Sequence, residues 1–140
     1  AVSLPVVVNG DIGSYEDAAE ALEQSGAHGV MIGRSAMGRP WLVGEVAAAL
    51  EGKAWTAPGR AEKLSSLCEQ IEDSVALYGP KLGVLTVRKH VSAAIDALDL
   101  RIGPAERRAV RSKLCQITDW QDLIAALRQV YFETDLVEAV

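Results

Sequence analysis

Two short polar stretches near the start of the chain contain the residues best suited to bind a phosphate group. They are Asn9, Gly10 and Asp11, and then Gly33 and Arg34, and each stretch follows a short apolar run. Glycine lets backbone N–H groups approach phosphate oxygens, and a guanidinium adds positive charge with paired donors. Asn9-Gly10-Asp11 alone is more typical of a turn. The second stretch, one strand–helix unit later, favours a phosphate or flavin site.

The residues around these stretches predict a strand–helix–strand unit. The runs 4–8 and 29–32 are apolar without polar alternation, which is typical of strands buried on both faces of a parallel sheet. The helix between them is expected to begin after Ser14 as N-cap and to stop at Gly26. Another helix is expected over Trp41–Leu50. Both polar stretches then lie at the carboxyl ends of neighbouring strands, where (β/α)₈ barrels carry phosphate sites.

In the second half of the chain, apolar residues recur at spacings of three and four, which predicts amphipathic helices. The first ends at Gly79-Pro80, with Tyr78 on its buried side. The next two are expected at about 82–98 and 105–116, and Thr118 opens the last as part of a capping box. Four such helices with short connections predict a compact antiparallel bundle.

Basic residues gather on two of these helices. Arg88, Lys89 and His90 lie together on one, and Arg107, Arg108 and Arg111 lie on the next, where they are expected to face outward. A charge run is commonly a solvated helix face. Taken together, the six residues could instead form a patch for the phosphates of folded RNA, in which His90 either contacts RNA or has a structural role.

Composition limits the possible functions. The chain has 140 residues and a net charge of −5, so binding to nucleic acid requires a local basic patch. The cysteines, Cys68 and Cys115, are too few for a disulfide framework or a metal site and are expected to be small core residues. No apolar run approaches the roughly 20 residues of a membrane helix. With no leader pattern either, we expect a cytoplasmic protein that does not contact membranes.

The motifs, in this order, resemble one protein family. Val7-Val8-Asn9-Gly10-Asp11-Ile12, then Gly29-Val30-Met31-Ile32-Gly33-Arg34 and Gly38-Arg39-Pro40-Trp41, are similar to the C-terminal part of bacterial tRNA-dihydrouridine synthases, most of all the DusB subgroup. Tyr78-Gly79-Pro80-Lys81 and Val87-Arg88-Lys89-His90-Val91 are similar to the helical domain of that subgroup. The resemblance extends from Pro5 to about Phe132.

The resemblance implies an α/β plus all-α fold, namely the last two βα units of a (β/α)₈ TIM barrel followed by a four-helix bundle domain. The barrel units are expected at 1–52, a linker at 53–59, the helical tRNA-binding domain at 60–133 and a tail at 134–140. Two strands cannot close a barrel. We therefore expect a fragment whose open strand edges are covered by the missing N-terminal barrel portion or by another chain.

The resemblance also implies a function. Members of this family reduce uridine in tRNA to dihydrouridine, with FMN as cofactor and NADPH as reductant. By resemblance, Asn9, Gly10, Asp11, Gly33 and Arg34 bind FMN, and the six basic residues bind tRNA. The family's proton-donating cysteine lies in an upstream barrel loop, and neither cysteine of this chain lies in a matching context. We therefore expect no catalytic residue and no metal ligand here, and a chain that is inactive alone.

Some alternatives stay open. Asp11 is expected to accept hydrogen bonds from loop N–H groups or to approach the polar edge of a flavin. Arg39 is either a second cation near the flavin or a loop anchor. The chain as a whole could instead belong to another phosphate- or flavin-binding barrel oxidoreductase, or be a non-catalytic helical interaction module.

Overall fold

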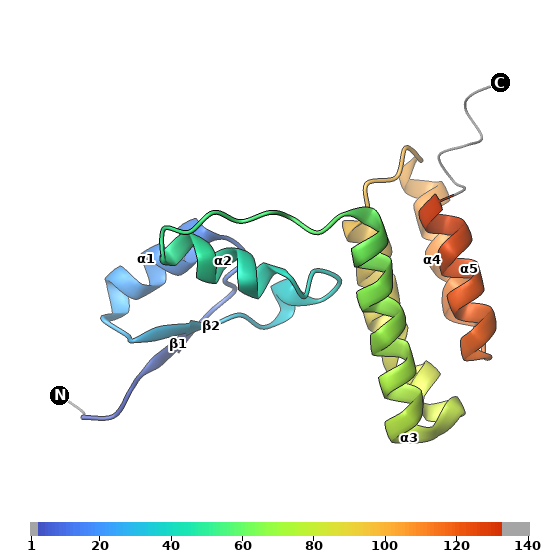
Figure 1. Cartoon of the computed structure of the whole chain (residues 1–140), viewed down its shortest axis with the longest axis horizontal. Coiled ribbons are helices and arrows are strands. Elements are labelled where there is room, and N and C mark those ends of the chain that lie inside the picture. The colour runs from blue at the N-terminus through green and yellow to red at the C-terminus, as the bar shows by residue number, and fades with distance from the viewer. Residues whose placement is uncertain (1–2, 133–140) are drawn as a thin grey trace. The chain divides into compact units, whose positions relative to one another are not determined.

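The computed structural model describes residues 3–132 and divides the chain into two compact units, with the boundary between Ala57 and Pro58 (Figure 1). This boundary falls within a stretch without regular secondary structure, 53–59. Within the described residues, no helix combines the length and the apolar character needed to span a membrane.

The first unit is built on a small parallel sheet. Strands β1 (Val7–Asn9) and β2 (Gly29–Met31) pair in parallel, and Asn9 lies opposite Met31. Because the strands run in the same direction, the chain leaves both of them at the same edge of the sheet. This register brings the segments after Asn9 and Met31 close together.

Helix α1 (Tyr15–Ser25) connects the two strands, and α2 (Leu42–Leu50) follows them. The Ser14 hydroxyl accepts a hydrogen bond from the backbone N–H of Asp17 at 3.1 Å, and Gly26 ends α1 with a left-handed φ of 63°. Both predicted boundaries of this helix are therefore confirmed.

Helix α1 packs against both strands, and α2 packs against α1 and against residues 34–36. The buried cluster consists of Ile12, Ala18, Leu42 and Val46, with Ala21, Val30 and Ile32 packed against it. Val7 and Met31 remain exposed. The expectation of strands buried on both faces is therefore wrong for the described residues, because α1 is the only helix that packs against the strands and it leaves side chains such as Val7 and Met31 uncovered.

Trp55 fastens the segment after α2 to that helix. Its indole lies so close to Gly44 that an added Cβ there would lie 2.7 Å from the ring carbon Cη2. Part of the predicted linker is therefore packed on the first unit.

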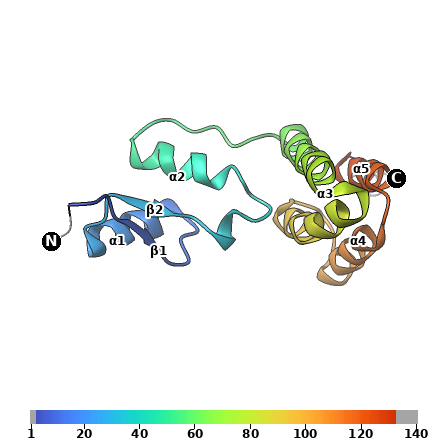
Figure 2. The same ribbon diagram turned by 90° about the horizontal axis from the view of Figure 1, so that it is seen from below.

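The second unit consists of α3 (Arg60–Ala97), α4 (Pro104–Gln116) and α5 (Trp120–Phe132). Helix α3 contains two helices separated at Gly79, whose φ of 78° and ψ of 166° are not helical. The two limbs double back and lie side by side (Figures 1 and 2). The predicted stop at Gly79-Pro80 is confirmed, because the chain reverses direction there.

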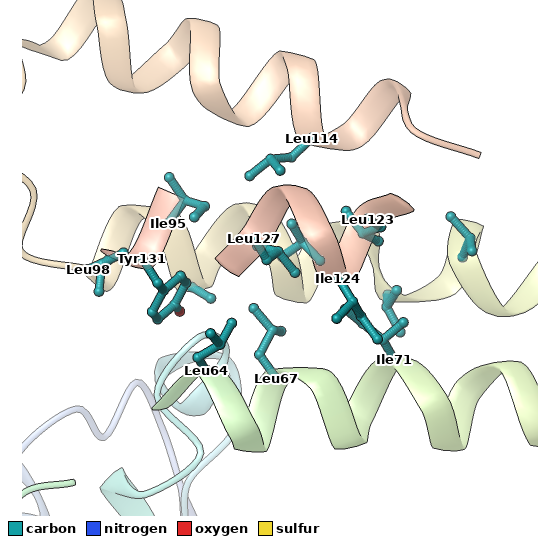
Figure 3. Close-up of a cluster of buried hydrophobic side chains, with 14 of the residues drawn as sticks. Leu64, Leu67, Ile71, Ile95, Leu98, Leu114, Leu123, Ile124, Leu127 and Tyr131 are labelled. Carbon is teal, nitrogen blue, oxygen red and sulfur yellow. The ribbon is translucent and has the colours of Figure 1, made fainter. Parts of the chain in front are cut away.

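The core of the second unit draws on both limbs of α3 and on α4 and α5. Figure 3 shows Tyr131 and Leu127 of α5 pointing between the other helices. The buried cluster consists of Leu64, Leu67, Ile71, Val84, Val87, Val91, Ala94, Ile95, Leu98, Leu100, Leu114, Leu123, Ile124, Leu127 and Tyr131. Tyr78 does not belong to it, being 50% exposed. Its predicted burial is wrong, because the chain leaves the helical path at the next residue.

The starts of α4 and α5 differ in how well they match expectation. Helix α4 begins at Pro104, one residue before the expected start at about 105, and ends at Gln116 as expected. At α5 the carboxylate of Asp119 accepts hydrogen bonds from the backbone N–H groups of Gln121 and Asp122 at 2.8 and 3.1 Å. The cap is therefore Asp119 rather than Thr118, and the helix begins one residue later than the capping box indicated.

The limbs of α3 approach each other closely at Gly83. An added Cβ there would lie 2.6 Å from Val75 Cα and 2.7 Å from the Ser74 carbonyl oxygen. The Ser74 hydroxyl also donates to the Gly83 carbonyl at 3.1 Å. The hairpin therefore requires a residue without a side chain at this position.

We predict that Gly83→Ala lowers the free energy of unfolding of the second unit by about 2 kcal/mol, because backbone atoms must separate to admit the methyl group. Denaturant unfolding followed by circular dichroism measures this loss. Gly103→Ala is the control, since an added Cβ at Gly103 meets nothing within 4 Å. Equal effects of the two substitutions would contradict the close approach.

Candidate functional site

The carboxyl ends of β1 and β2 form one side of a pocket of about 290 Å³. Its lining residues come from the segments after the two strands and from the 3₁₀ turn η1 (Arg34–Ala36). They are Asn9, Gly10, Asp11, Ile12, Gly33, Arg34 and Ser35. All five residues of the predicted phosphate site are therefore brought together. This volume is at the lower end of the range for small-molecule sites.

The loop after β1 is held from two sides. The Asp17 carboxylate accepts a hydrogen bond from the backbone N–H of Gly13 at 2.9 Å, and the Arg39 guanidinium donates to the Gly13 carbonyl at 3.3 Å. The Gly13 N–H and then the Ser14 hydrogen bond lower the pKa of Asp17, so its carboxylate stays charged at neutral pH. Of the two interpretations of Arg39, the geometry supports the loop anchor.

Arg34 and Asp11 face each other at the mouth of the pocket. The Arg34 guanidinium contacts the Asp11 carboxylate at 2.6 Å, and both side chains are more than 80% exposed. An ion pair this exposed contributes little stability, so the guanidinium can turn toward another anion at small cost. Asp11 also has a positive φ of 23°, an uncommon conformation for a residue other than glycine.

Ser35 is a pocket residue that the sequence did not identify. Its side chain lies beside Gly13, with the hydroxyl oxygen 3.4 Å from the position a Gly13 Cβ would occupy. Within residues 3–132 the hydroxyl has no hydrogen-bond partner. Its position next to Arg34 was the only sequence feature that could have indicated a role.

The basic residues of the second unit do not form a single group. Arg107 is partly buried, and its guanidinium donates to the carbonyl oxygens of Ile95, Leu98 and Leu100 at the end of α3. The expectation that Arg107 faces outward is therefore wrong. The last carbonyl groups of a helix have no hydrogen-bond donor within the helix, and here the Arg107 guanidinium donates to them.

Arg111 and Arg88 lie between α3 and α4. Arg111 contacts the Asp96 carboxylate at 2.6 Å, and the Cys115 thiol lies 3.8 Å from the Arg88 carbonyl oxygen. The Nε atoms of Arg88 and Arg111 are buried, and neither has a hydrogen-bond partner in the described residues. These two Nε atoms are closed to solvent, so they cannot contact another molecule in this conformation.

Lys89 and Arg108 are exposed, and no hydrogen bond or ion pair engages them within the described residues. His90 is partly buried, and burial together with the Lys89 charge lowers its pKa below the usual value. His90 is therefore neutral at physiological pH and adds no charge to its surroundings.

The two cysteines, Cys68 and Cys115, are free thiols and both are partly buried. Burial raises the pKa of Cys68, which keeps its thiol protonated at neutral pH. Among the described residues, no group of three histidine, cysteine or acidic side chains is arranged to hold a metal ion.

The structure thus combines an α/β unit, whose parallel strand ends form a polar pocket with a cation, and a helical unit with exposed basic residues. The family model for dihydrouridine synthases (Dus) matches residues 1–134, and the chain belongs to this family.

Curated relatives agree with this assignment. A "Probable tRNA-dihydrouridine synthase" of Rhodobacter capsulatus is 38% identical over 136 residues, which cover 96% of this chain and 40% of the relative. The "tRNA-dihydrouridine synthase B" of Pseudomonas aeruginosa is 40% identical over 134 residues, covering 95% of this chain and 39% of the relative. A protein of the same name from Xanthomonas axonopodis is 46% identical over 92 residues, covering 65% and 28%. The chain thus resembles the B type and spans about two fifths of the length of the first relative.

We predict that Arg107→Ala lowers the free energy of unfolding of the second unit by about 3 kcal/mol, because three carbonyl groups lose a charged donor. Arg108→Ala, at the adjacent exposed position, is expected to change it by less than about 0.5 kcal/mol. Thermal and denaturant unfolding of both variants tests the difference. A stable Arg107→Ala variant would show that the carbonyl groups do not need this guanidinium.

Proposed function

We propose that this chain is the C-terminal portion of an FMN-dependent tRNA-dihydrouridine synthase, which reduces uridine in tRNA with NADPH as reductant. The single observation that carries the proposal is the pocket at the ends of β1 and β2, in a chain that belongs to the dihydrouridine synthase family. The proposed roles are part of the FMN phosphate site for the first unit and tRNA binding for the second.

The pocket suits the phosphate end of FMN. An added Cβ at Gly10 or Gly33 would meet nothing within 4 Å, so the backbone there is open to an approaching group. Arg34 is exposed, and the Ser35 hydroxyl has no partner within the described residues. A cation, a free hydroxyl and open glycine backbone match the oxygens of a phosphate dianion.

In this proposal the polar residues in and around the pocket either bind FMN or hold the loop that lines its site. Arg34 turns from Asp11 toward the phosphate, and Ser35 donates its hydroxyl proton to a phosphate oxygen. Asn9 and Asp11 offer polar groups to the sugar-alcohol chain, while Asp17 and Arg39 keep the loop in place through Gly13. FMN, when bound, supplies the hydride that no side chain can provide. We assign no catalytic residue and no metal ligand to this chain.

The proposed tRNA surface uses the basic residues of α3 and α4 whose side chains do not donate to backbone carbonyl groups, unlike Arg107. These are Arg88, Lys89, His90, Arg108 and Arg111, with His90 as a neutral hydrogen-bonding or stacking group. Arg107 is assigned a positioning role, because its guanidinium holds the end of α3. A tRNA enzyme needs such a clamp because the target base must leave its stack to reach the cofactor.

The other two hypotheses have less support. A different barrel oxidoreductase, or a helical interaction module, would account for one unit only, whereas the family match covers both. The exposed residues of the sheet, such as Val7 and Met31, fit a cover supplied by further barrel units or by another chain. We further propose that the intact enzyme acts in the cytoplasm, where tRNA is modified.

We predict that FMN and inorganic phosphate shift the amide NMR resonances of Gly10, Gly33 and Ser35, whereas riboflavin, which lacks the phosphate, does not. Arg34→Gln is expected to weaken FMN binding about tenfold, the loss of one charge-assisted contact. Lys53→Gln, which removes an exposed cation outside the pocket, serves as the control. Identical responses to FMN and riboflavin would rule out a phosphate site.

We predict that the chain binds tRNA weakly and in a salt-dependent manner. Replacing Arg88, Lys89 and Arg108 with glutamine should weaken binding and reduce the slope of log K against log salt by about two to three, roughly one unit per lost phosphate contact. Filter binding or fluorescence anisotropy across a salt series measures both quantities. Arg128→Gln on α5 is the control, an exposed arginine outside the proposed surface. An unchanged slope in the triple variant would show that the patch does not contact phosphates.

A further inference from the structure

The end of the α3 hairpin exposes several large apolar side chains. Leu77 and Tyr78, before the reversal, are 73% and 50% exposed, and Leu82 and Leu85, after it, are both 54% exposed. Lys81 lies among them and is also exposed. We call these five residues the hairpin-end surface. Isolated exposed leucines are common, but four large apolar side chains within nine residues form a patch typical of a binding surface.

The hairpin limbs are fixed against each other just behind this surface. The Ser74 hydroxyl donates to the Gly83 carbonyl, and the missing side chain of Gly83 lets the second limb touch the backbone of Val75. Gly79 makes the turn between them. The hairpin-end surface is therefore carried by two packed helical limbs rather than by a long loop.

Charge indicates which partner this surface fits. The chain carries a net charge of −5, yet no acidic residue occurs between Asp73 and Asp96. The basic residues in that interval are Lys81, Arg88 and Lys89. The second limb therefore has cations but no carboxylate before Asp96, which favours an anionic partner on that limb. On the first limb the exposed Glu72 and Asp73 lie just before Leu77, so the anionic groups of the partner are expected at the second limb.

The surface is also continuous with the proposed tRNA contacts. Leu85 lies midway between Lys81 and Lys89, four residues from each, so all three occupy one side of the second limb. All three are exposed. An RNA strand held at Lys89 can therefore also reach Leu85 and Lys81.

We propose that the hairpin-end surface binds unstacked bases of tRNA, with Tyr78 and Leu85 packing against base faces and Lys81 contacting a neighbouring phosphate. This inference rests on the proposed tRNA binding by the helical unit. Nucleobases are flat, apolar on their faces and joined by phosphates, which matches an exposed aromatic ring and leucines beside a lysine. A lipid bilayer and a second copy of this chain are the competing occupants.

The test compares tRNA affinities of the full chain carrying single substitutions. Tyr78→Ala should weaken tRNA binding about tenfold with the salt slope unchanged, because a stacking contact releases no counterions. Tyr78→Phe should retain the wild-type affinity, since the ring face remains. Lys81→Gln should reduce the slope by about one.

Phe132→Ala is the matched control. Phe132 is an aromatic residue of the same unit, 49% exposed, at the end of α5. The Tyr131 carbonyl beside it accepts a hydrogen bond from Arg60 at the start of α3, so Phe132 lies next to that end of the helix rather than to the hairpin end. Its substitution should leave tRNA affinity unchanged. A second control is an RNA duplex without loops, whose binding Tyr78→Ala should not affect.

The outcomes separate this inference from the proposed function. If wild-type chain binds tRNA and the triple variant at Arg88, Lys89 and Arg108 loses affinity, but Tyr78→Ala binds like wild type, only the hairpin-end assignment is wrong. If wild-type chain does not bind tRNA, both proposals fail. Loss of binding to phosphatidylserine vesicles, or of self-association in sedimentation, with tRNA affinity intact in Tyr78→Ala, would assign the surface to a membrane or a second copy and overturn the inference.

Discussion

The parallel register of β1 and β2 is the constraint on which the pocket depends. Because Asn9 lies opposite Met31, the chain emerges from both strands at one edge, and Asp11 and Arg34 meet there although 23 residues separate them. A slip of one residue would also turn the buried side chains to the other face of the sheet. The pocket is thus a consequence of strand pairing, and Gly13, held by Asp17 and Arg39, fixes the loop that completes it.

In the second unit, hydrogen-bond satisfaction divides the arginines into two kinds. Arg60 donates to the carbonyls of Asp99 and Tyr131, and Arg107 donates to those of Ile95, Leu98 and Leu100. These two guanidiniums join the ends of α3 to α4 and α5. If such a guanidinium turned toward a ligand, the carbonyl groups that it contacts would lose their hydrogen bonds. It is therefore poorly placed to bind a ligand. Arg88 and Arg108 have no such partners within the described residues.

Local rules predicted the local features well. Ser14 and Gly26 predicted the two ends of α1, because a hydroxyl that accepts from a first-turn N–H and a glycine with a left-handed φ are typical of helix ends. Gly79-Pro80 predicted the reversal of α3, because glycine adopts a positive φ easily and proline lacks the N–H that would continue the helix. The failures came from contacts between distant residues. Arg107 and Arg108 are adjacent residues of the same type, so the sequence does not distinguish them. They differ only in the folded chain, where the carbonyl groups at the end of α3 lie within reach of the Arg107 guanidinium. Tyr78 fitted the apolar periodicity but is the last residue before the turn, and Ser35 gained its place from Gly13, 22 residues earlier.

The distribution of charge also constrains how an RNA can approach. On α1 the side chains of Glu16, Asp17, Glu20 and Glu23 are all exposed, so the first unit presents a strongly acidic helix to solvent. The second limb of α3 lacks carboxylates until Asp96. A polyanion is repelled by the first helix and attracted by the second, and both effects act over about a Debye length, roughly 8 Å at physiological ionic strength. Because the net charge of −5 opposes nucleic-acid binding, the proposed RNA contact depends on the exposed cations of the second unit, and the acidic face of α1 cannot contribute to it.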